Sequence, residues 1–338
     1  MQAYEVREPD ADYGGVVEVE RDRPTPDADE ALVRIHACSL NYRDLAIANP
    51  ELTYPGTSLP VIPLSDGAGE VVEVGEDVDR LSEGDRVATP FAPDWVDGPF
   101  AQEKATRTTG GNVDGALAQY VTFPAESLPV LPDYLSYEEG ATLSCAGLTA
   151  WRALIENGNL RADETVLALG TGGVSTFALQ FASMRGARVV VTSSSDEKLA
   201  RARELGADET INYEETPEWG DVVQERTGGA DHVVEVGGPG TLERSLQAAG
   251  IGGHVHLIGV LAGPEGNVNP APILLKSLDV EGLMGVGSRK MFDRMLAAMA
   301  AEEMEPVIDR VFDFDGVRDA YRYVERGEHQ GKVVVSVE

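Results

Sequence analysis

A glycine-rich turn lies between an apolar strand and an amphipathic helix near the middle of the chain. Residues 165–195 read TVLALGTGGVSTFALQFASMRGARVVVTSSS, with one apolar run at 166–169 and a second at 188–192. The apolar residues between these runs recur at the spacing of a single helix face: Val174, Phe177, Ala178, Phe181 and Ala182. This order of strand, turn, helix and strand predicts a βαβ unit that binds a dinucleotide.

The first residues of the turn are predicted to hold the pyrophosphate. Gly170 permits a tight turn, and Gly172 leaves bare backbone that a pyrophosphate can approach closely. Gly173 and Val174 open the helix, whose N-terminus offers unpaired N–H groups and a positive dipole end. Ser175 stands where the usual fingerprint has its third glycine or an alanine. The alternative interpretation is a flexible glycine loop between ordinary elements.

The end of the second strand predicts which dinucleotide is bound. Units that bind NAD usually carry an acidic residue about 20 positions after the first glycine, where it accepts hydrogen bonds from the ribose hydroxyls. This chain instead has three hydroxyls and a nearby ammonium: Ser193, Ser194, Ser195 and Lys198. These groups suit a 2′-phosphate, which a carboxylate would repel, so we predict NADP(H) as the cofactor. Two alternatives stay open: Asp196 or Glu197 faces the pocket, and Ser195 serves as a helix cap.

The surrounding elements divide the chain into two types of fold. After residue 195, strands predicted at 209–213, 231–236, 254–260 and 279–284 alternate with helices at 196–205, 221–227 and 241–249, which indicates a parallel sheet covered by helices on both faces. The first 125 residues instead predict short strands of an antiparallel barrel at 31–38, 70–74, 86–89 and 119–123, with a long loop at 92–116 between the last two. A helix around 314–326 and a strand at 332–337 return the chain to this first domain.

Composition excludes several classes of function. The chain has 338 residues, which favours two domains, and it contains no apolar run long enough to cross a membrane. Its two cysteines form neither a disulfide framework nor a zinc motif, and its N-terminus is not a signal peptide, so a cytoplasmic location is expected. The net charge of −31 argues against nucleic-acid or membrane partners. Because only 5 of the 27 basic residues are lysines, we also expect a salt-loaded cytoplasm, where ions screen the repulsion.

Several motifs together resemble the medium-chain dehydrogenase/reductase superfamily over essentially the full chain. They are NYRD at 41–44, GAG at 67–69 followed by VVEVGEDVDRLSEGDRV, AGLTAW at 146–151, GTGGVS at 170–175, VEVGG at 234–238 and GKVVV at 331–335. The resemblance implies an α/β protein with a GroES-like β-barrel catalytic domain (1–127 and 287–338) and a Rossmann doubly wound domain (128–286). It also implies a homodimer, commonly formed through the edge strand of the nucleotide-binding sheet.

The resemblance adds further residues to the predicted cofactor site. It implies that Thr149 lies near the pyrophosphate and that Tyr213 lies beside the adenosine phosphate. It also implies that the nicotinamide end is bordered by residues at later strand ends: Val236, Gly237, Ile258, Gly259, Met284, Gly285 and Val286. The plainer interpretation of the glycine pairs is that they form strand-end turns.

The same resemblance predicts that the protein lacks zinc. Superfamily members that use a catalytic zinc place Cys, His and Cys at positions that correspond here to Asn41, Ser65 and Cys145, and the four-cysteine structural zinc lobe is missing as well. A catalytic zinc needs about three protein ligands, so one cysteine is too few. The chain therefore is most similar to the zinc-independent branch, which contains quinone and enone reductases.

The chemistry expected without a metal is hydride transfer to a soft acceptor. We expect an NADPH-dependent reductase of a quinone or α,β-unsaturated carbonyl, with Asn41 orienting either the carbonyl group or the nicotinamide and Tyr42 as a donor. Asn41 and Asp44 alternatively brace their loop, and Tyr42 alternatively packs. Two other functions stay open: an alcohol dehydrogenase or carbonyl reductase of the same superfamily, and an NADPH-binding sensor or structural protein that turns over poorly. Cys38 and Cys145 are expected to be small buried residues.

Overall fold

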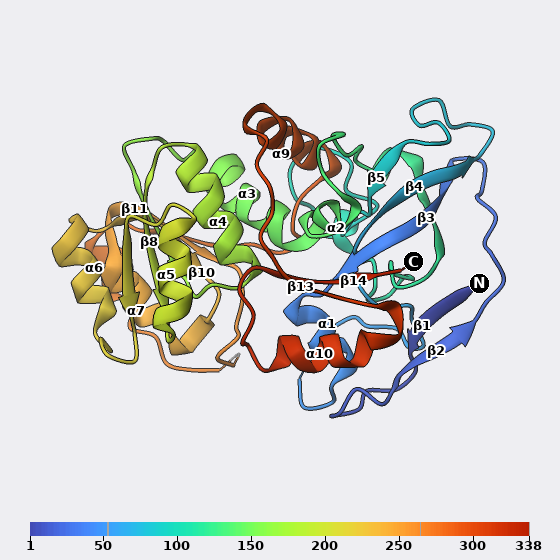
Figure 1. Cartoon of the computed structure of the whole chain (residues 1–338). Coiled ribbons are helices and arrows are strands. Elements are labelled where there is room, and N and C mark those ends of the chain that lie inside the picture. Colours follow the sequence, from blue (N-terminus) through green and yellow to red (C-terminus); the bar gives the residue numbers. More distant parts are fainter. Residues whose placement is uncertain (53, 264, 338) are drawn as a thin grey trace. The chain divides into compact units, whose positions relative to one another are not determined.

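The computed structural model describes residues 1–52, 54–263 and 265–337 (Figure 1). Its contacts divide the chain into a two-segment unit, Met1–Leu148 with Gly285–Glu338, and an inserted unit, Thr149–Met284. Residues 128–148, which the sequence analysis placed in the Rossmann domain, group here with the two-segment unit. Helix α2 (Tyr137–Gly140) packs there against the central strands of that unit, and Ser144 Oγ donates to the carbonyl oxygen of Thr89 at 2.7 Å.

The inserted unit is built on a six-stranded parallel sheet, as predicted. Its strands follow the order β12-β11-β10-β7-β8-β9, in which the chain starts at the centre, moves to one edge and then returns to build the other half. This is the doubly wound arrangement, in which a ligand binds where the strand order reverses. The strands are β7 (Thr165–Leu169), β8 (Arg188–Ser193), β9 (Glu209–Asn212), β10 (Ala230–Glu235), β11 (Ala249–Leu257) and β12 (Asp279–Gly282).

The helices of this unit pack on the sheet through their apolar faces. The predicted face of α4 (Gly173–Met184) is buried at Phe177, Ala178, Phe181 and Ala182, and Phe177 stacks on Phe181 with ring centroids 5.8 Å apart. Helices α4 and α5 contact β7, β8 and β9, whereas α6 and α7 contact β10 and β11. Right-handed connections put these two pairs on opposite faces of the sheet. The other helices are α5 (Asp196–Glu204), α6 (Trp219–Thr227), α7 (Leu242–Ala248), α8 (Ala271–Leu275), a 3-10 turn at Gly238–Gly240 and a π-helical segment at Arg152–Asn157.

The long strand β3 (Glu30–Ser39) organises the two-segment unit. One edge of β3 pairs with β4, and the other pairs first with β6 and then, at 37–39, with β14. These pairings are antiparallel, as predicted, but β13 adds to β14 in parallel, which the sequence analysis did not anticipate. The remaining strands are β1 (Gln2–Val6) and β2 (Val16–Glu20), which form a separate hairpin, with β4 (Asp66–Val74), β5 (Arg86–Ala88), β6 (Tyr120–Pro124), β13 (Ile308–Phe312) and β14 (Lys332–Ser336).

The helices of the two-segment unit are short or lie late in the chain. Helices α1 (Tyr42–Ala48) and α9 (Arg289–Glu302) were not predicted, whereas α10 (Val317–Glu325) follows a 3-10 turn at Phe314–Gly316 inside the predicted helical segment. Helix α3 (Leu148–Trp151) spans the boundary between the units, and further helical turns occupy Gln102–Ala105, Ala125–Ser127 and Leu143–Gly147. Within the described residues, no helix combines the length and the apolar character that a membrane span requires.

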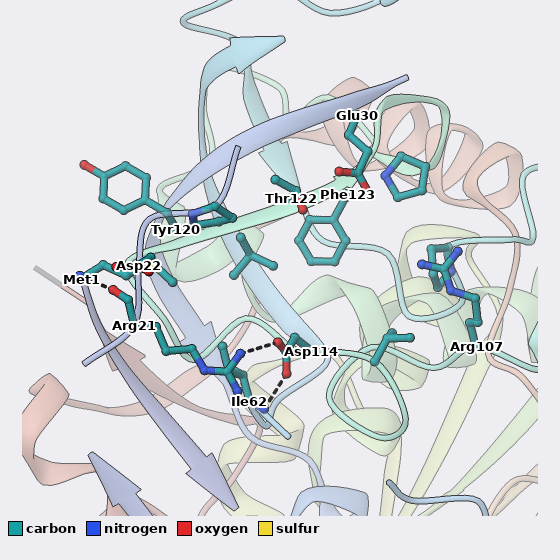
Figure 2. Close-up of a pocket in the computed structure, with 15 residues that line it drawn as sticks. Met1, Arg21, Asp22, Glu30, Ile62, Arg107, Asp114, Tyr120, Thr122 and Phe123 are labelled. Carbon is teal, nitrogen blue, oxygen red and sulfur yellow. Dashed lines mark hydrogen bonds and ion pairs between the residues drawn. The ribbon is translucent and has the colours of Figure 1, made fainter. Parts of the chain in front are cut away.

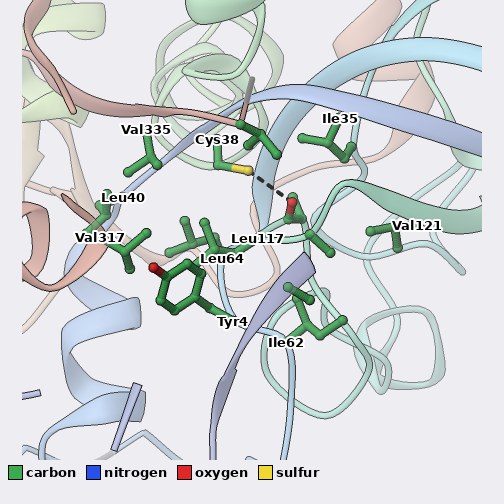
Figure 3. Close-up of a cluster of buried hydrophobic side chains, with 14 of the residues drawn as sticks. Tyr4, Ile35, Cys38, Leu40, Ile62, Leu64, Leu117, Val121, Val317 and Val335 are labelled. Carbon is green, nitrogen blue, oxygen red and sulfur yellow. Dashed lines mark hydrogen bonds between the residues drawn. The ribbon is translucent and has the colours of Figure 1, made fainter. Parts of the chain in front are cut away.

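Buried side chains from distant segments form the core of the two-segment unit (Figure 3). Tyr4, Leu64 and Leu117 lie there with Val317 and Val335 from the second segment. Cys38 is fully buried among them, and its thiol donates to the carbonyl oxygen of Ala116 at 3.0 Å. Burial raises the pKa of the Cys38 thiol, because the apolar surroundings disfavour a thiolate. Cys38 is therefore a core residue, as expected from the sequence.

Helix α1 begins next to a buried carboxylate. Asp44 Oδ2 accepts a hydrogen bond from the backbone N–H of Asn41 at 2.8 Å and so caps the helix, and the Asp44 side chain is fully buried. Burial raises the pKa of Asp44 to about 6, and the charge on Arg43 opposes that rise. The bracing role that the sequence left open for Asp44 is therefore present in the structure.

We expect Asp44→Asn to change the free energy of unfolding more favourably above pH 7 than near pH 4. The folded state binds this proton more tightly than the unfolded chain, whose aspartates titrate near 3.9. The ionised form in the native state therefore destabilises the protein by up to about 3 kcal/mol above pH 6, and this loss disappears as the pH falls towards 4. The side-chain oxygen of the asparagine introduced at position 44 can still accept the hydrogen bond from the backbone N–H of Asn41. Guanidinium unfolding of both proteins across this pH range measures the difference, with the exposed Asp315→Asn as the control; a difference independent of pH contradicts the prediction.

Candidate functional site

The glycine turn lies at the carboxyl end of β7, at the centre of the parallel sheet. Gly170 has a φ of +73°, which favours glycine, and its N–H points to Thr192 Oγ1 at 3.4 Å, so the turn is tied to the end of β8. A Cβ added at Gly172 meets no atom within 4 Å, so the backbone at this N-cap of α4 borders open space. Gly173 and Val174 follow in the first turn of the helix, where N–H groups lack helical partners. This geometry suits a bound pyrophosphate.

Ser175 replaces the third fingerprint glycine without disturbing the turn. Its side chain is 3% exposed, and Oγ donates to the carbonyl oxygen of Leu169 at 2.6 Å. The hydroxyl therefore satisfies a carbonyl group at the strand end from inside the helix. Thr176 makes a similar contact from Oγ1 to the carbonyl oxygen of Thr171 at 3.1 Å.

The three serines form the corner between β8 and α5. Ser193 is buried at the strand end, Ser194 is exposed and Ser195 is half-buried. Ser195 Oγ accepts from the N–H of Lys198 at 3.4 Å as the N-cap of α5, so the capping role that the sequence left open is present. Ser193 Oγ accepts from the N–H of Ser195 at 3.3 Å. Each of these two hydroxyls uses a lone pair in these bonds and keeps its O–H to donate to a ligand.

The neighbouring acidic residue is engaged elsewhere. Asp196 Oδ1 accepts from Asn212 Nδ2 at 2.9 Å, at the end of β9, so this carboxylate has a partner outside the serine segment. Tyr213 follows β9 directly, is 38% exposed, and donates its N–H to the carbonyl oxygen of Ser193 at 3.1 Å. The structure thus brings Tyr213 to the serine segment, next to the predicted adenosine end of the site.

The loop after β10 is organised by Glu235, which the sequence analysis missed. This carboxylate is fully buried at the strand end. Its Oε1 accepts from the N–H groups of Gly237 at 2.7 Å and Gly238 at 3.0 Å and from Thr241 Oγ1 at 2.6 Å, while Oε2 accepts from Ser245 Oγ. The signal in the sequence is an acidic residue that ends an apolar strand immediately before two glycines and a hydroxyl residue.

The structure groups some of the remaining predicted cofactor residues but not all of them. Ile258 and Gly259 both donate N–H groups to the carbonyl oxygen of Glu235, at 2.8 and 3.4 Å, so the ends of β10 and β11 meet around Val236. Met284 is 66% exposed and its carbonyl oxygen accepts from Arg152 Nη1 at 2.7 Å. Thr149 is buried in α3, and the last two predicted residues, Gly285 and Val286, belong to the two-segment unit.

A second polar cluster lies in the two-segment unit, where β14, β3 and β4 meet. Asn41 is the N-cap of α1, and Tyr42, the first residue of that helix, is 43% exposed. Lys332, at the start of β14, reaches this point with its ammonium group buried; the whole residue is 2% exposed. Its Nζ donates to the carbonyl oxygen of Leu40 and to Asn41 Oδ1, both at 2.6 Å, and lies 3.5 Å from Asp66 Oδ2.

Asp66 is the anion that balances this ammonium. It is fully buried at the start of β4, and its oxygens accept from Ser65 Oγ at 2.7 Å and from Ser39 Oγ at 3.3 Å. Ser39 Oγ also lies 3.0 Å from the carbonyl oxygen of Ala141. The sequence analysis included Lys332 only as part of the GKVVV motif and did not anticipate its contact with Asp66.

The side chains at the three positions implied for zinc do not fit that metal. Asn41 Oδ1 is bound by an ammonium, and Ser65 Oγ is hydrogen-bonded to Asp66. Burial raises the pKa of the Cys145 thiol, and the charge on Asp66 raises it further, which disfavours the thiolate that zinc requires. The ammonium of Lys332 lies in contact with two members of the cluster and would repel a dication. No group of three His, Cys, Asp or Glu residues in the described parts of the chain is arranged to hold a metal.

A separate cavity of about 240 Å³ in the two-segment unit does not involve either cluster (Figure 2). Arg21 and Asp114 line it and pair with each other, with Nη1 2.8 Å from Oδ2. The other oxygen of Asp114 accepts from the N–H of Ile62 at 3.0 Å. The described residues that line the cavity include none of the predicted site residues, and these polar groups already have partners, so the cavity indicates no ligand.

Comparison with known proteins assigns both units to families. Residues 27–133 match the family described as the alcohol dehydrogenase GroES-like domain, and residues 173–301 match the family described as zinc-binding dehydrogenase. The chain is 43% identical over 317 residues to a zinc-type alcohol dehydrogenase-like protein of Schizosaccharomyces pombe (strain 972), covering 91% of both chains.

Solved structures agree with this assignment along the whole chain. One from Sinorhizobium meliloti 1021, named provisionally as an alcohol dehydrogenase, is 40% identical, covers 99% of both chains and superimposes with a TM-score of 0.91. Another, described as an NAD-dependent alcohol dehydrogenase, is 30% identical, covers 100% of both chains and has a TM-score of 0.90. The predicted GroES-like and Rossmann domains are therefore confirmed, and this chain is an oxidoreductase of the medium-chain dehydrogenase/reductase superfamily.

Proposed function

We propose that this protein is an NADPH-dependent, zinc-independent oxidoreductase that transfers hydride to a quinone or an α,β-unsaturated carbonyl compound. The observation that carries the proposal is the polar cluster around Asn41. An amide held by a buried ammonium stands where a metal ligand is implied, and the side chains beside it do not form a zinc site. Hydrogen-bond donors, rather than a Lewis acid, are therefore available to a substrate oxygen.

Conjugated acceptors suit such a site. When bound, NADPH supplies the hydride, which adds to the β-carbon of an enone or to the ring of a quinone. The negative charge that develops is spread over the conjugated system, so it needs less stabilisation than the alkoxide formed from a simple ketone. We propose that the amide of Asn41 donates to this oxygen and that Tyr42, which is exposed beside it, is a second donor.

An alcohol dehydrogenase or carbonyl reductase is the second candidate. Relatives that match 91% or more of the chain carry alcohol dehydrogenase names, including one that is 43% identical. The same cluster would then bind an alcohol or ketone oxygen. The two candidates differ in the acceptor that turns over best, and both require activity without a bound metal.

We expect the purified protein to reduce quinones or enones with NADPH at least tenfold more efficiently than simple ketones, measured as kcat/KM in concentrated KCl. Because the cluster does not fit zinc, we expect less than one tightly held zinc per chain by elemental analysis, and activity that persists after dialysis against a chelator.

Each contrary result has a distinct meaning. Preference for ketones or alcohols without metal favours the second candidate. Stoichiometric zinc whose removal abolishes activity contradicts the proposal. Tight NADPH binding with no turnover of any of these substrates favours a sensor or structural protein, the third function left open by the sequence.

We propose NADPH rather than NADH on the basis of the β8–α5 corner. Ser193 and Ser195 keep hydroxyl protons, and Asp196 is hydrogen-bonded to Asn212. A 2′-phosphate beside these residues would meet hydroxyl donors and the N-terminus of α5, a nine-residue helix. The NAD-dependent structural relative described above makes NADH the direct alternative.

We expect Ser193→Asp to lower kcat/KM with NADPH by roughly 10- to 1000-fold, because two unit charges about 4 Å apart repel by about 1–4 kcal/mol near a protein surface. The kcat/KM with NADH should change far less. Ser183→Asp adds the same charge near the C-terminus of α4, at the end of that helix away from the glycine turn, and serves as the control. A wild-type enzyme that prefers NADH contradicts the cofactor proposal before any variant is made.

We propose that the protein forms a homodimer through the free edge of the sheet in the inserted unit. Because the chain has a net charge of −31, we propose no nucleic-acid or membrane partner. Strand β12 ends the sheet, and strongly exposed apolar residues flank it. Leu274 and Leu275 in α8 are 82% and 80% exposed, and Ile251 in β11 is 88% exposed. Exposed apolar side chains beside an unpaired strand edge favour association.

We expect light scattering to give a mass about twice the 36.1 kDa of one chain. Replacing both Leu274 and Leu275 by Asp should shift the protein towards monomer, because it puts four new charges into a symmetric interface. Val311→Asp, at a residue 48% exposed in the two-segment unit, serves as the control. A wild-type monomer in concentrated KCl contradicts the proposal.

A further inference from the structure

The ammonium of Lys332 determines which way the amide of Asn41 faces. Amide oxygen and nitrogen are hard to tell apart by shape alone, and hydrogen-bond partners decide between them. Lysine has three N–H donors and no acceptor. Because Nζ lies 2.6 Å from one amide atom of Asn41, that atom must be the oxygen, Oδ1. The nitrogen, Nδ2, is thereby turned away from Lys332.

Nδ2 is a donor without an acceptor. It is shielded from solvent, and no hydrogen-bond partner for it occurs among residues 1–52, 54–263 and 265–337. A shielded amide N–H without a partner is unfavourable, and such groups in native structures call for a functional explanation. A substrate oxygen that reaches Nδ2 must displace the atoms that cover it and would then supply the missing acceptor.

Lys332 is itself held in a fixed position by the fold. Strand β14 pairs with the end of β3, where Val334 lies opposite Ser39, and the N–H of Leu40 donates to the carbonyl oxygen of Val333 at 3.0 Å. The buried carboxylate of Asp66 balances its charge at 3.5 Å. Each of the three ammonium protons therefore has its own acceptor, in Leu40, Asn41 or Asp66. The contact with the Asn41 amide is thus fixed by the other two.

We propose that Lys332 is a positioning residue that locks the amide of Asn41, so that Nδ2 is presented to the carbonyl oxygen of the substrate. Lys332 acts through Asn41 and does not touch the substrate. The ammonium also draws electron density towards Oδ1, which makes the N–H groups better donors. An oriented donor stabilises developing negative charge without having to reorganise during the reaction. This inference rests on the proposed function for the identity of the ligand, a carbonyl oxygen.

A double-mutant cycle in concentrated KCl tests the inference. We expect Asn41→Ala to lower kcat roughly 10- to 100-fold on the preferred carbonyl substrate, in line with the loss of one oxyanion donor, with the Kd for NADPH unchanged. Lys332→Met should lower kcat to a similar extent. In the double variant, Lys332→Met should add less than about twofold to the effect of Asn41→Ala, because the ammonium acts only through that amide.

Two further variants separate positioning from stability. Lys332→Met leaves Asp66 buried without its counter-ion, so Lys332→Met with Asp66→Asn removes both charges and keeps the variant folded; this pair should lose the same activity. Lys276→Met is the matched control, because Lys276 Nζ donates to the carbonyl oxygens of Gln247 at 2.6 Å and Ala249 at 2.8 Å in the inserted unit. Its loss should lower Tm and leave kcat unchanged.

A measurement that does not depend on turnover completes the test. The side-chain amide NMR signals of Asn41, assigned by their absence in Asn41→Ala, should form one sharp pair that shifts when cyclohexenone is added with NADP⁺. In the charge-free double variant they should broaden or split as the amide reorients.

The outcomes separate this inference from the proposed function. Full activity in Lys332→Met while Asn41→Ala is impaired overturns the inference, as do multiplicative losses in the cycle or wild-type amide signals that ignore cyclohexenone. A wild-type protein that reduces no carbonyl compound overturns the proposed function. In that event, the amide signals alone decide whether Lys332 orients a carbonyl-binding donor.

Discussion

A buried ion pair between Lys332 and Asp66 holds together the part of the two-segment unit that carries the candidate substrate site. The ammonium and the carboxylate are 3% and 0% exposed as side chains, and each would be strongly destabilising without the other. Their contact joins the last strand of the chain to the beginning of β4 and to the end of β3. Lys332 is 266 residues from Asp66 and 292 residues from Leu40 in the sequence, yet the three segments meet at this pair of charges. The amide of Asn41 takes its orientation from the same ammonium.

The inserted unit also contains a buried charged group, the carboxylate of Glu235. Glu235 ends β10 inside the protein, and its charge is balanced by N–H and O–H donors from the loop that follows rather than by a basic residue. A loop with two glycines has many conformations available, and these bonds select one of them. The carbonyl oxygen of the same residue accepts from Ile258, so the loop after β10 and the end of β11 share a common support. The loop at the predicted cofactor site is thereby held in one conformation although it is built from flexible residue types.

Replacing metal ligands changes the chemistry of the cluster without changing the fold. The chain superimposes on alcohol dehydrogenase-like structures with TM-scores of 0.90 and 0.91, yet an amide and a hydroxyl occupy two positions where zinc-dependent members have cysteine and histidine. The barrel strands and the Rossmann sheet are specified by apolar residues elsewhere, so the cluster is free to differ. In the mechanism proposed here, a fixed ammonium takes the place of the dication and polarises a neighbouring amide instead of binding the substrate oxygen itself.

Local sequence determined the parts of this protein that depend on short-range order. The strand, glycine turn and helix from Thr165 onward were predictable because apolar periodicity and a glycine at φ +73° are properties of a few adjacent residues. The role of Ser195 as a helix cap and the bracing role of Asp44 were predictable as alternatives for the same reason, although helix α1 itself was not. In contrast, α9, the parallel pairing of β13 and the assignment of 128–148 to the two-segment unit depend on packing against distant elements.

Only the tertiary structure revealed which charged groups act together. Lys332 and Asn41 are 291 residues apart, and nothing in either local sequence indicates that they touch. Glu235 was not singled out by the sequence analysis, because the donors that surround it become neighbours only in the folded loop. Pairing of buried charges is set by which strands become neighbours, and strand neighbours are chosen by the burial of the whole apolar core. The sequence alone therefore determined the fold and the class of cofactor-binding motif, whereas the orientation of the polar groups was decided by long-range packing.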